Sequence, residues 1–179
     1  MKTPFAIAAL LALVAAPLAA QKPDFSGTWK LNPEKSDPMG PPGGMSGQRP
    51  PADPASGNRP PGGGMGGMRP TELFITQFDS KMVVEQKMAD QSRMLTYYLD
   101  GRESKNPGMR GNDMTTKSVW KDNAIVTEGE NTVTSPMGEV TIKTKETRSL
   151  SDDGKTMTII AVINSPRGEM TRKLVYEKP

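Results

Sequence analysis

The sequence predicts an all-β fold, an antiparallel up-and-down meander of about eight to ten strands. Three observations lead to this prediction. From Thr71 onward, strand-length segments rich in β-branched and aromatic residues follow one another. Short links rich in Asp, Asn, Gly and Pro separate them. No segment after residue 70 shows the apolar repeat of an amphipathic helix.

The first strand is predicted at residues 25–31, where large and small side chains alternate. Phe25, Gly27, Trp29 and Leu31 fall on one face of an extended chain, and polar residues fall on the other. This is the pattern of a half-buried strand. We therefore expect the Trp29 ring to be a buried anchor of a single rolled-up sheet.

Eight further strands are predicted in the second part of the chain. They are expected at residues 72–78, 82–88, 93–99, 114–121, 124–133, 139–150, 156–164 and 169–177. Nine strands in strict alternation leave the first and last parallel, so a simple antiparallel barrel cannot close on them. Three solutions remain open: one strand lies outside the barrel, residues 102–105 form a short tenth strand, or two segments are one bent strand.

Two kinds of turn alternate along the meander. Residues 122–123 and 151–154 are short links rich in Asp and Asn, whereas residues 135–141 and 165–171 repeat the pattern Ser-Pro-x-Gly-Glu. Alternate links of a meander lie at the same end of the sheet. The nine-strand count therefore places the Pro-Gly turns at one end, and the Asp-rich turns at the other end together with the segment 38–70.

Two segments differ in composition from the strands. Residues 1–20 combine Lys2, an apolar run and terminal small residues, which is the layout of a secretory signal peptide. Residues 21–179 are then one domain, exported to the periplasm or the extracellular space, without a further apolar run long enough to span a bilayer. Residues 38–70 consist mainly of Gly, Pro, Met and Arg, which predicts a disordered loop between the first and second strands.

The composition argues against several kinds of chemistry. The chain contains no cysteine and no histidine, so it has no thiolate and no imidazole to act as general base or metal ligand. Its 23 basic and 20 acidic side chains give a net charge of +3, and the basic residues are scattered, which argues against nucleic-acid binding. We expect a monomeric, non-catalytic protein that needs no cofactor.

Residues 24–36 (Asp-Phe-Ser-Gly-Thr-Trp-Lys-Leu-Asn-Pro-Glu-Lys-Ser) and residues 150–158 carry a family resemblance. A Gly-x-Trp on the first strand, a large first loop and a late basic residue resemble the calycins, the lipocalin-like barrels. The phrases are similar to those of exported bacterial β-barrel proteins of unknown function in this group. The resemblance implies that Trp29 packs across a closed base against a late arginine, Arg172 or else Arg148.

Two strand faces supply the candidate ligand-binding residues. On residues 139–150, alternate side chains form a face that is apolar at both ends and charged in the middle, at Glu146 and Arg148. The face of residues 169–177 that holds Arg172 is similar. If both faces point into the barrel, these charges meet the polar head group of a small amphipathic or apolar ligand. The aromatic residues expected to hold its apolar body are Trp29, Tyr98 and Trp120.

Two other interpretations stay open. Buried charges must be paired, so Glu146 and Arg148 could instead form an internal pair in a solid barrel. The protein would then be an interaction or scaffold protein that contacts partners through the Gly/Pro/Met-rich loop. A further possibility is Cu(I) binding by that loop, because thioether sulfurs are soft ligands. Its methionines are Met39, Met45, Met65 and Met68.

Overall fold

A computed structural model describes residues 22–38, 69–88, 91–108, 112–135, 138–166 and 168–179. The predicted signal peptide, residues 1–20, lies outside these ranges. So does nearly all of the predicted disordered loop, residues 38–70, of which only Pro38, Arg69 and Pro70 are described. The predicted copper ligands of that loop are outside them too.

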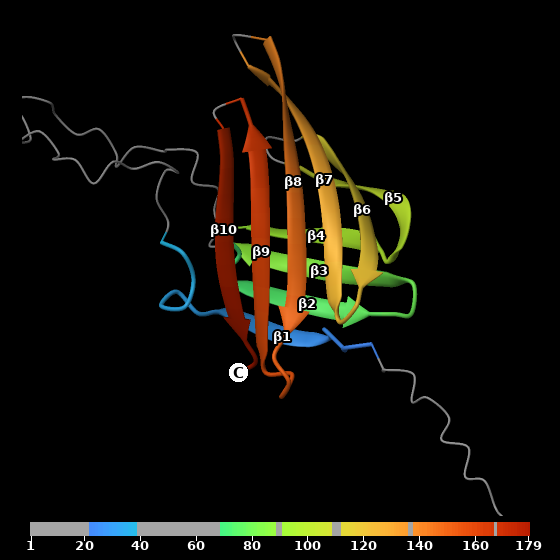
Figure 1. The fold of residues 1–179 in the computed structure, drawn as a ribbon, viewed down its shortest axis with the longest axis vertical. Helices are drawn as coiled ribbons and strands as arrows, with labels where there is room; N and C mark the ends of the chain where they lie inside the picture. Colours follow the sequence, from blue (N-terminus) through green and yellow to red (C-terminus); the bar gives the residue numbers. More distant parts are fainter. Residues whose placement is uncertain (1–21, 39–68, 89–90, 109–111, 136–137, 167) are drawn as a thin grey trace, which may run out of the picture.

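The described residues form ten β-strands (Figure 1). In chain order these are β1 (Gly27–Leu31), β2 (Glu72–Gln77), β3 (Lys81–Met88), β4 (Gln91–Tyr98), β5 (Asp100–Pro107), β6 (Asp113–Lys121), β7 (Ala124–Ser135), β8 (Gly138–Leu150), β9 (Thr156–Ser165) and β10 (Gly168–Glu177). Their order in the sheet is β4-β3-β2-β1-β10-β9-β8-β7-β6-β5, and all paired neighbours are antiparallel.

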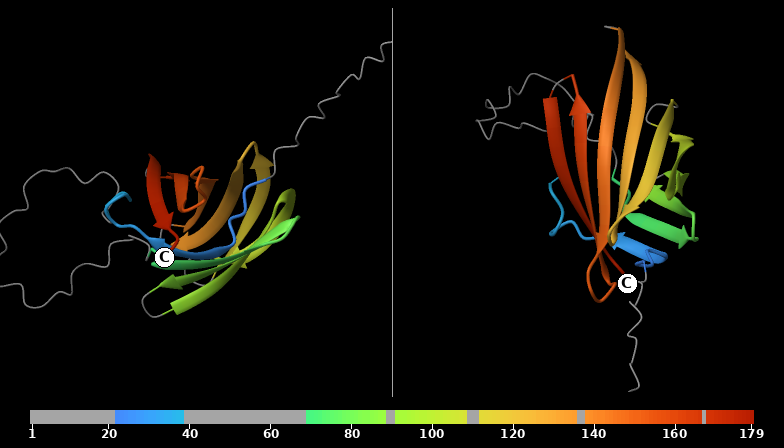
Figure 2. Two further views of the ribbon diagram at one scale, coloured as in Figure 1. Left: turned by 90° about the horizontal axis from the view of Figure 1, so that it is seen from below. Right: turned by 45° about the vertical axis from the view of Figure 1, so that its right-hand side comes forward.

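The sheet curls on itself because β1 pairs with both β2 and β10. Ile75 lies opposite Gly27 on one side, and Glu177 lies opposite Lys30 on the other. Strands β2–β4 then run across β6–β10 as a second layer (Figures 1 and 2). The predicted all-β meander is confirmed as a nearly closed barrel. The short tenth strand, one of the three open solutions, is the correct one.

The Pro-Gly turns share one end and the Asp-rich turns the other, as predicted, but the tenth strand reverses how both relate to the link after β1. Because β5 precedes the first Asp-rich turn, each later link moves to the opposite end from that expected for nine strands. The link after β1, residues 38–70, therefore follows an odd-numbered strand, as do the Pro-Gly turns after β7 and β9. The Asp-rich turns after β6 and β8 are at the other end.

Among the described residues, no backbone ladder pairs the two edge strands β4 and β5. Side-chain hydrogen bonds join them instead. The Thr96 backbone N–H donates to Asn106 Oδ1 at 2.7 Å, and its carbonyl accepts from Asn106 Nδ2 at 2.8 Å. Ser104 Oγ donates to the same carbonyl at 2.6 Å and lies 2.9 Å from Thr116 Oγ1. These polar residues are buried. They therefore replace the missing ladder and satisfy backbone groups that burial would otherwise leave unpaired.

Replacing Asn106 with alanine should loosen this β4–β5 seam. Both Thr96 backbone groups lose a partner, so we expect a loss of about 1–3 kcal/mol in the free energy of unfolding. We also expect faster hydrogen exchange at the Thr96 amide, measured by NMR. Asn123→Ala in the exposed turn after β6 is the control and should change neither quantity. Unchanged exchange at Thr96 in the Asn106 variant would show that the side chain does not hold the seam.

The end of the barrel at the Asp-rich turns is closed by apolar side chains. The Trp29 side chain has no exposed surface, and its indole Nε1 donates to the Phe25 carbonyl at 2.8 Å. Trp29 belongs to one buried core cluster, whose other members are Phe25, Leu73, Ile75, Met82, Val84, Leu95, Tyr97, Leu99, Ile125, Met157, Ile159 and Tyr176. The prediction that Trp29 is a buried anchor is confirmed.

The cation that lies over the Trp29 ring is not the predicted Arg172. Lys178 Nζ lies 4.9 Å from the ring centroid, just beyond the end of β10. Arg172 is further back along β10, where its Nη2 lies 3.8 Å from the Met170 sulfur. β1 pairs with β10 only near the end of that strand, at Tyr176 and Glu177. This register brings the residue after the strand to the indole.

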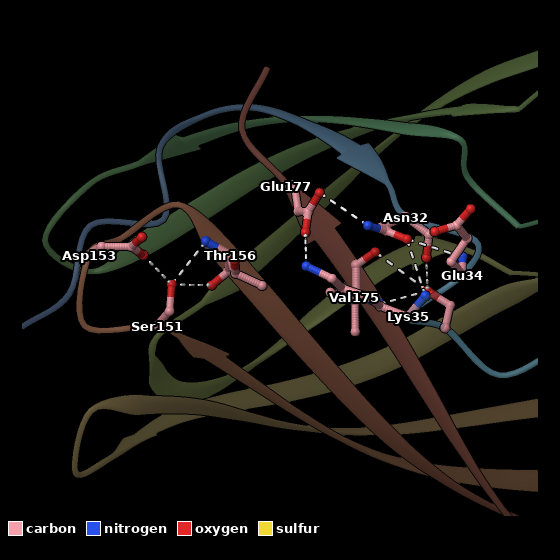
Figure 3. Close-up of polar contacts among 9 residues, drawn as sticks. Asn32, Glu34, Lys35, Ser151, Asp153, Thr156, Val175 and Glu177 are labelled. Carbon is pink, nitrogen blue, oxygen red and sulfur yellow. Dashed lines mark hydrogen bonds and ion pairs between the residues drawn. The ribbon is translucent and has the colours of Figure 1, made fainter.

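Residues 32–37 cover the free edge of β10 beyond β1 (Figure 3). The Asn32 side-chain oxygen accepts from the backbone N–H groups of Glu34 and Lys35 at 3.0 and 3.1 Å, as expected for a capping residue. The Glu177 carboxylate accepts from Lys35 Nζ at 2.6 Å and from Asn32 Nδ2 at 3.1 Å. Ser36 Oγ accepts from the backbone of β10 at 2.9 Å.

This contact should depend on pH. The hydrogen bonds from Lys35 and Asn32 lower the pKa of Glu177 below its ordinary value of 4.5. The stabilisation is therefore fully present above about pH 4.5 and is lost as the pH falls through the lower, folded-state pKa. We expect carbon-13 NMR to show Glu177 titrating below the ordinary glutamate pKa of 4.5. We also expect Glu177→Gln to weaken the pH dependence of stability in that range. A Glu177 midpoint at or above 4.5 would contradict the prediction.

Candidate functional site

The long strands β8, β9 and β10 turn alternate side chains into the barrel, as the sequence predicted. Arg148 lies opposite Ile125, and Tyr176 lies opposite Met157, and both of these partners belong to the core. The inward faces of β8 and β10 are therefore the predicted ones. They comprise Val140, Ile142, Thr144, Glu146, Arg148 and Leu150 on β8, and Met170, Arg172, Leu174 and Tyr176 on β10.

Burial on these faces changes along the strands. Towards the Asp-rich turns, Arg148, Ile159 and Tyr176 are buried, whereas the inward residues further along the strands are only half-buried. Figure 1 shows why, because β7–β10 extend past the layer of β2–β4 that covers their lower part. We call the half-buried inward residues the upper inner face. They are Val140, Ile142, Thr144, Ala161, Ile163, Met170 and Arg172.

Arg148 lies where the upper inner face meets the closed core, and its exposed fraction is only 3%. Its Nη2 forms an ion pair with Glu146 Oε1 and donates to the Tyr97 hydroxyl at 3.3 Å. The guanidinium also lies 4.6 Å from the Tyr97 ring centroid. Its other terminal nitrogen, Nη1, is buried and has no hydrogen-bond partner among the described residues.

The electrostatic environment keeps Arg148 charged. Burial alone would lower the pKa of its guanidinium, but the Glu146 carboxylate and the Tyr97 hydroxyl raise it above its ordinary value. Burial also raises the pKa of Tyr97, so this phenol stays protonated at neutral pH. The site therefore holds a permanently charged guanidinium whose Nη1 has no acceptor, next to a carboxylate that pairs with the other terminal nitrogen.

The structure brings together two of the four predicted ligand-binding residues, Glu146 and Arg148. Tyr98 faces outward, where the Arg102 guanidinium lies 4.0 Å from its ring centroid, so its predicted place inside the barrel is wrong. The inward tyrosine of β4 is Tyr97. The register gives the reason, because Tyr97 lies opposite Met82 in the core and its neighbour must point the other way.

Trp120 faces inward, but it belongs to the closed end. Its ring lies 6.0 Å from the Phe25 ring at an angle of 48°, and Lys22 Nζ lies 5.3 Å from its centroid. The sheet register separates it from Arg148 by Ile125, which lies opposite each of them. Its buried Nε1 has no partner among the described residues. Trp120 therefore lies in the same cross-strand row as Arg148, packs against the core, and is not part of the upper inner face.

Sequence reasoning missed two residues of this region, Tyr97 and Arg69. Tyr97 had a usable signal, because Leu95, Tyr97 and Leu99 alternate as an inward face. Arg69 had none, since it stands at the edge of a Gly/Pro/Met-rich segment that carries no structural period. In the structure its side chain is buried, just before the start of β2.

The surface also has hollows outside the barrel. One, of about 390 Å³, lies between the turn at residues 122–123 and the outer side of β8, lined among others by Lys145 and Thr147. Another of about 390 Å³ lies beside Pro33 and Lys178. Both are on the outer surface. In the described ranges, no cluster of three or more acidic side chains is arranged to hold a metal ion. Those ranges also hold no helix long and apolar enough to cross a bilayer.

Comparison with protein-family models and with curated proteins finds no match. Similar solved structures include a REP1-NXSQ fatty acid transporter, 12% identical with a TM-score of 0.45, covering 60% of this chain and 69% of that one. A secretary abundant heat soluble protein from Ramazzottius varieornatus is 13% identical with a TM-score of 0.45, covering 60% and 70%. Apo lipid binding protein 8 from Caenorhabditis elegans is 9% identical with a TM-score of 0.44, also covering 60% and 70%. The strand order of this chain, taken by itself, shows a ten-stranded antiparallel meander that forms a nearly closed barrel, the fold that the resemblance implied.

Proposed function

We propose that the protein binds a small amphipathic molecule with an acidic head group on the upper inner face of its barrel. The observation that carries this proposal is the free Nη1 of Arg148. Burying a charged group with an unused donor costs free energy. Arg148 lies next to the upper inner face, whose side chains are still partly exposed to solvent. An anionic head group supplies the missing acceptor.

The wall above Arg148 suits the rest of such a molecule. Ile142, Ile163 and Met170 face inward there and are only half-buried. Covering these side chains with an apolar ligand chain contributes about 25 cal/mol to the binding free energy for each Å² of apolar area removed from water. A carboxylate at the Nη1 edge can form a charge-assisted hydrogen bond while Glu146 keeps its place on Nη2. The residues thus provide both a polar contact and an apolar contact.

The proposal includes the export that the signal-peptide pattern of residues 1–20 predicts. We propose that the chain is exported and carries its ligand outside the cytoplasm without chemical conversion. The absence of cysteine and histidine from the whole chain supports a binding role rather than a catalytic one. A scaffold protein with a solid barrel is the second candidate. It is favoured by the packed lower half, where the core residues fill the interior.

A displacement titration tests the proposal. The delipidated chain from residue 21 is loaded with fluorescent cis-parinaric acid, and dodecanoate or dodecanol is added as competitor. We expect dodecanoate to bind more tightly than dodecanol. Arg148→Met should weaken dodecanoate by about ten- to a hundredfold, the value of a charge-assisted hydrogen bond, with little effect on dodecanol.

Arg102→Met is the matched control, because Arg102 also lies over a tyrosine ring but on the outer face. It should leave both affinities unchanged. The double variant Glu146→Gln/Arg148→Met removes both charges and provides a folded reference if the single variant is unstable. Failure of the wild-type chain to take up any of these probes would reject the proposal and favour the scaffold protein.

A further inference from the structure

Arg69 is buried at the point where the chain enters β2, with an exposed fraction of 9%. Its Nη2 donates to the Pro38 carbonyl at 3.0 Å. Residue 37 in turn pairs with β10, because the Asp37 N–H donates to the Lys173 carbonyl at 2.9 Å and its Oδ2 accepts from the Lys173 N–H at 2.6 Å. These contacts hold the Arg69 guanidinium beside β10, level with residues 172 and 173.

Arg172 occupies the same level of β10 and points into the barrel. Its Nη2 contacts the Met170 sulfur at 3.8 Å, which is a weak acceptor. None of the ion pairs among the described residues includes Arg69 or Arg172. The Arg69 Nε is buried and has no hydrogen-bond partner there. Two guanidinium groups thus share one region with unused donor capacity.

In this region the positive charges of Arg69 and Arg172 are not matched by carboxylates that are free to pair with them. Burial lowers the pKa of Arg69, and the nearby positive charge of Arg172 lowers it further. Asp37 and Tyr176 act in the opposite direction. Asp37 is exposed and already accepts from the β10 backbone, and the Tyr176 hydroxyl donates to the Pro70 carbonyl at 3.0 Å. The carboxylate inside the barrel, Glu146, is paired with Arg148.

We propose that Arg69 and Arg172 form a second anion subsite, separate from the Arg148–Glu146 pair, that takes a tetrahedral oxyanion of the phosphate class. Two guanidinium groups in one region offer such an anion two positive charges and several N–H donors. The anion relieves the repulsion between the two arginines and supplies the acceptor that Arg69 Nε lacks. It can arrive as free phosphate or as the phosphate head of an amphipathic ligand.

Calorimetric titration of the full mature chain tests the subsite with inorganic phosphate and with dodecyl phosphate. Arg69→Gln and Arg172→Gln should each weaken phosphate binding at least about tenfold, as expected for a lost charge-assisted bond. Arg102→Gln on the outer face is the control and should leave it unchanged. Because Arg172 is only half-buried, its variant keeps the test decisive if Arg69→Gln does not fold.

The two probes distinguish the source of the anion. Similar affinities for both indicate free phosphate, whereas much tighter binding of dodecyl phosphate indicates a head group, and either result supports the subsite. The outcome is independent of the proposed function, since Arg148→Gln should weaken dodecanoate while inorganic phosphate still responds to Arg69→Gln and Arg172→Gln. The subsite is overturned if neither probe binds, or if neither glutamine variant changes the affinity.

Discussion

Replacing Arg148 with methionine is expected to lower the free energy of unfolding by about 3–5 kcal/mol. The substitution leaves the Glu146 carboxylate beside a buried site without its partner, and it removes the hydrogen bond to the Tyr97 hydroxyl. An uncompensated charge in the interior costs more than the pair contributed when intact. Urea denaturation of wild type and variant measures the loss directly.

Removing the second charge should reverse most of this effect. Glu146→Gln/Arg148→Met leaves neither member of this pair as an unpaired charge, so we expect a stability much closer to that of wild type. Lys145→Met and Glu128→Gln supply a control pair, because that ion pair is exposed on the outer face of β8 and its neighbour β7. Their effects should be small. Equal destabilisation in the single and double interior variants would contradict the account of Arg148.

Replacing Trp29 with alanine is expected to cost about 3–5 kcal/mol, the usual range for a large aromatic in a core. The indole is fully buried, lies between β2 and the end of β10, and donates a hydrogen bond to the Phe25 carbonyl. Its loss leaves a cavity where the first and last strands of the barrel meet. The midpoint of urea denaturation should fall accordingly.

Two companion variants sharpen the Trp29 prediction. Trp29→Phe keeps most of the apolar volume but removes the Nε1 donor, so it should cost clearly less than Trp29→Ala. Met94→Ala, at a side chain that is 61% exposed, should have almost no effect. If Trp29→Ala proves no more destabilising than Met94→Ala, the ring is not the anchor of the closed end.

The strands with an apolar face could be predicted from the sequence, and β5 shows why one could not. Residues 100–107 read Asp-Gly-Arg-Glu-Ser-Lys-Asn-Pro, and the inward side chains are Ser104 and Asn106. Their alternation is polar on both faces, so the period-two hydrophobic signal is absent. Gly101, with a positive φ of 86°, lies at the turn between β4 and β5. The seam to β4 depends on tertiary hydrogen bonds, which no local pattern encodes.

The candidate site could be predicted where it depended only on the alternation of side chains between the two faces of a strand. Glu146 and Arg148 follow the alternation from Val140 to Leu150, and the structure places both as inward residues. The same alternation decides which tyrosine of β4 faces inward. The prediction of Tyr98 instead of Tyr97 did not apply it.

Contacts between distant segments were not accessible in the same way. The position of Lys178 over Trp29 depends on where β10 pairs with β1, and that of Arg69 on contacts with Pro38 and β10.

Methyl NMR of the isoleucine side chains during a dodecanoate titration tests the central claim most directly. Ile142 and Ile163 lie on the upper inner face, Ile75 lies in the closed core, and Ile160 lies on the outer side of β9. We expect shifts and intermolecular contacts to the ligand chain at Ile142 and Ile163, with little change at the other two. Perturbation confined to Ile160, or absent from all four, would contradict a ligand site inside the barrel.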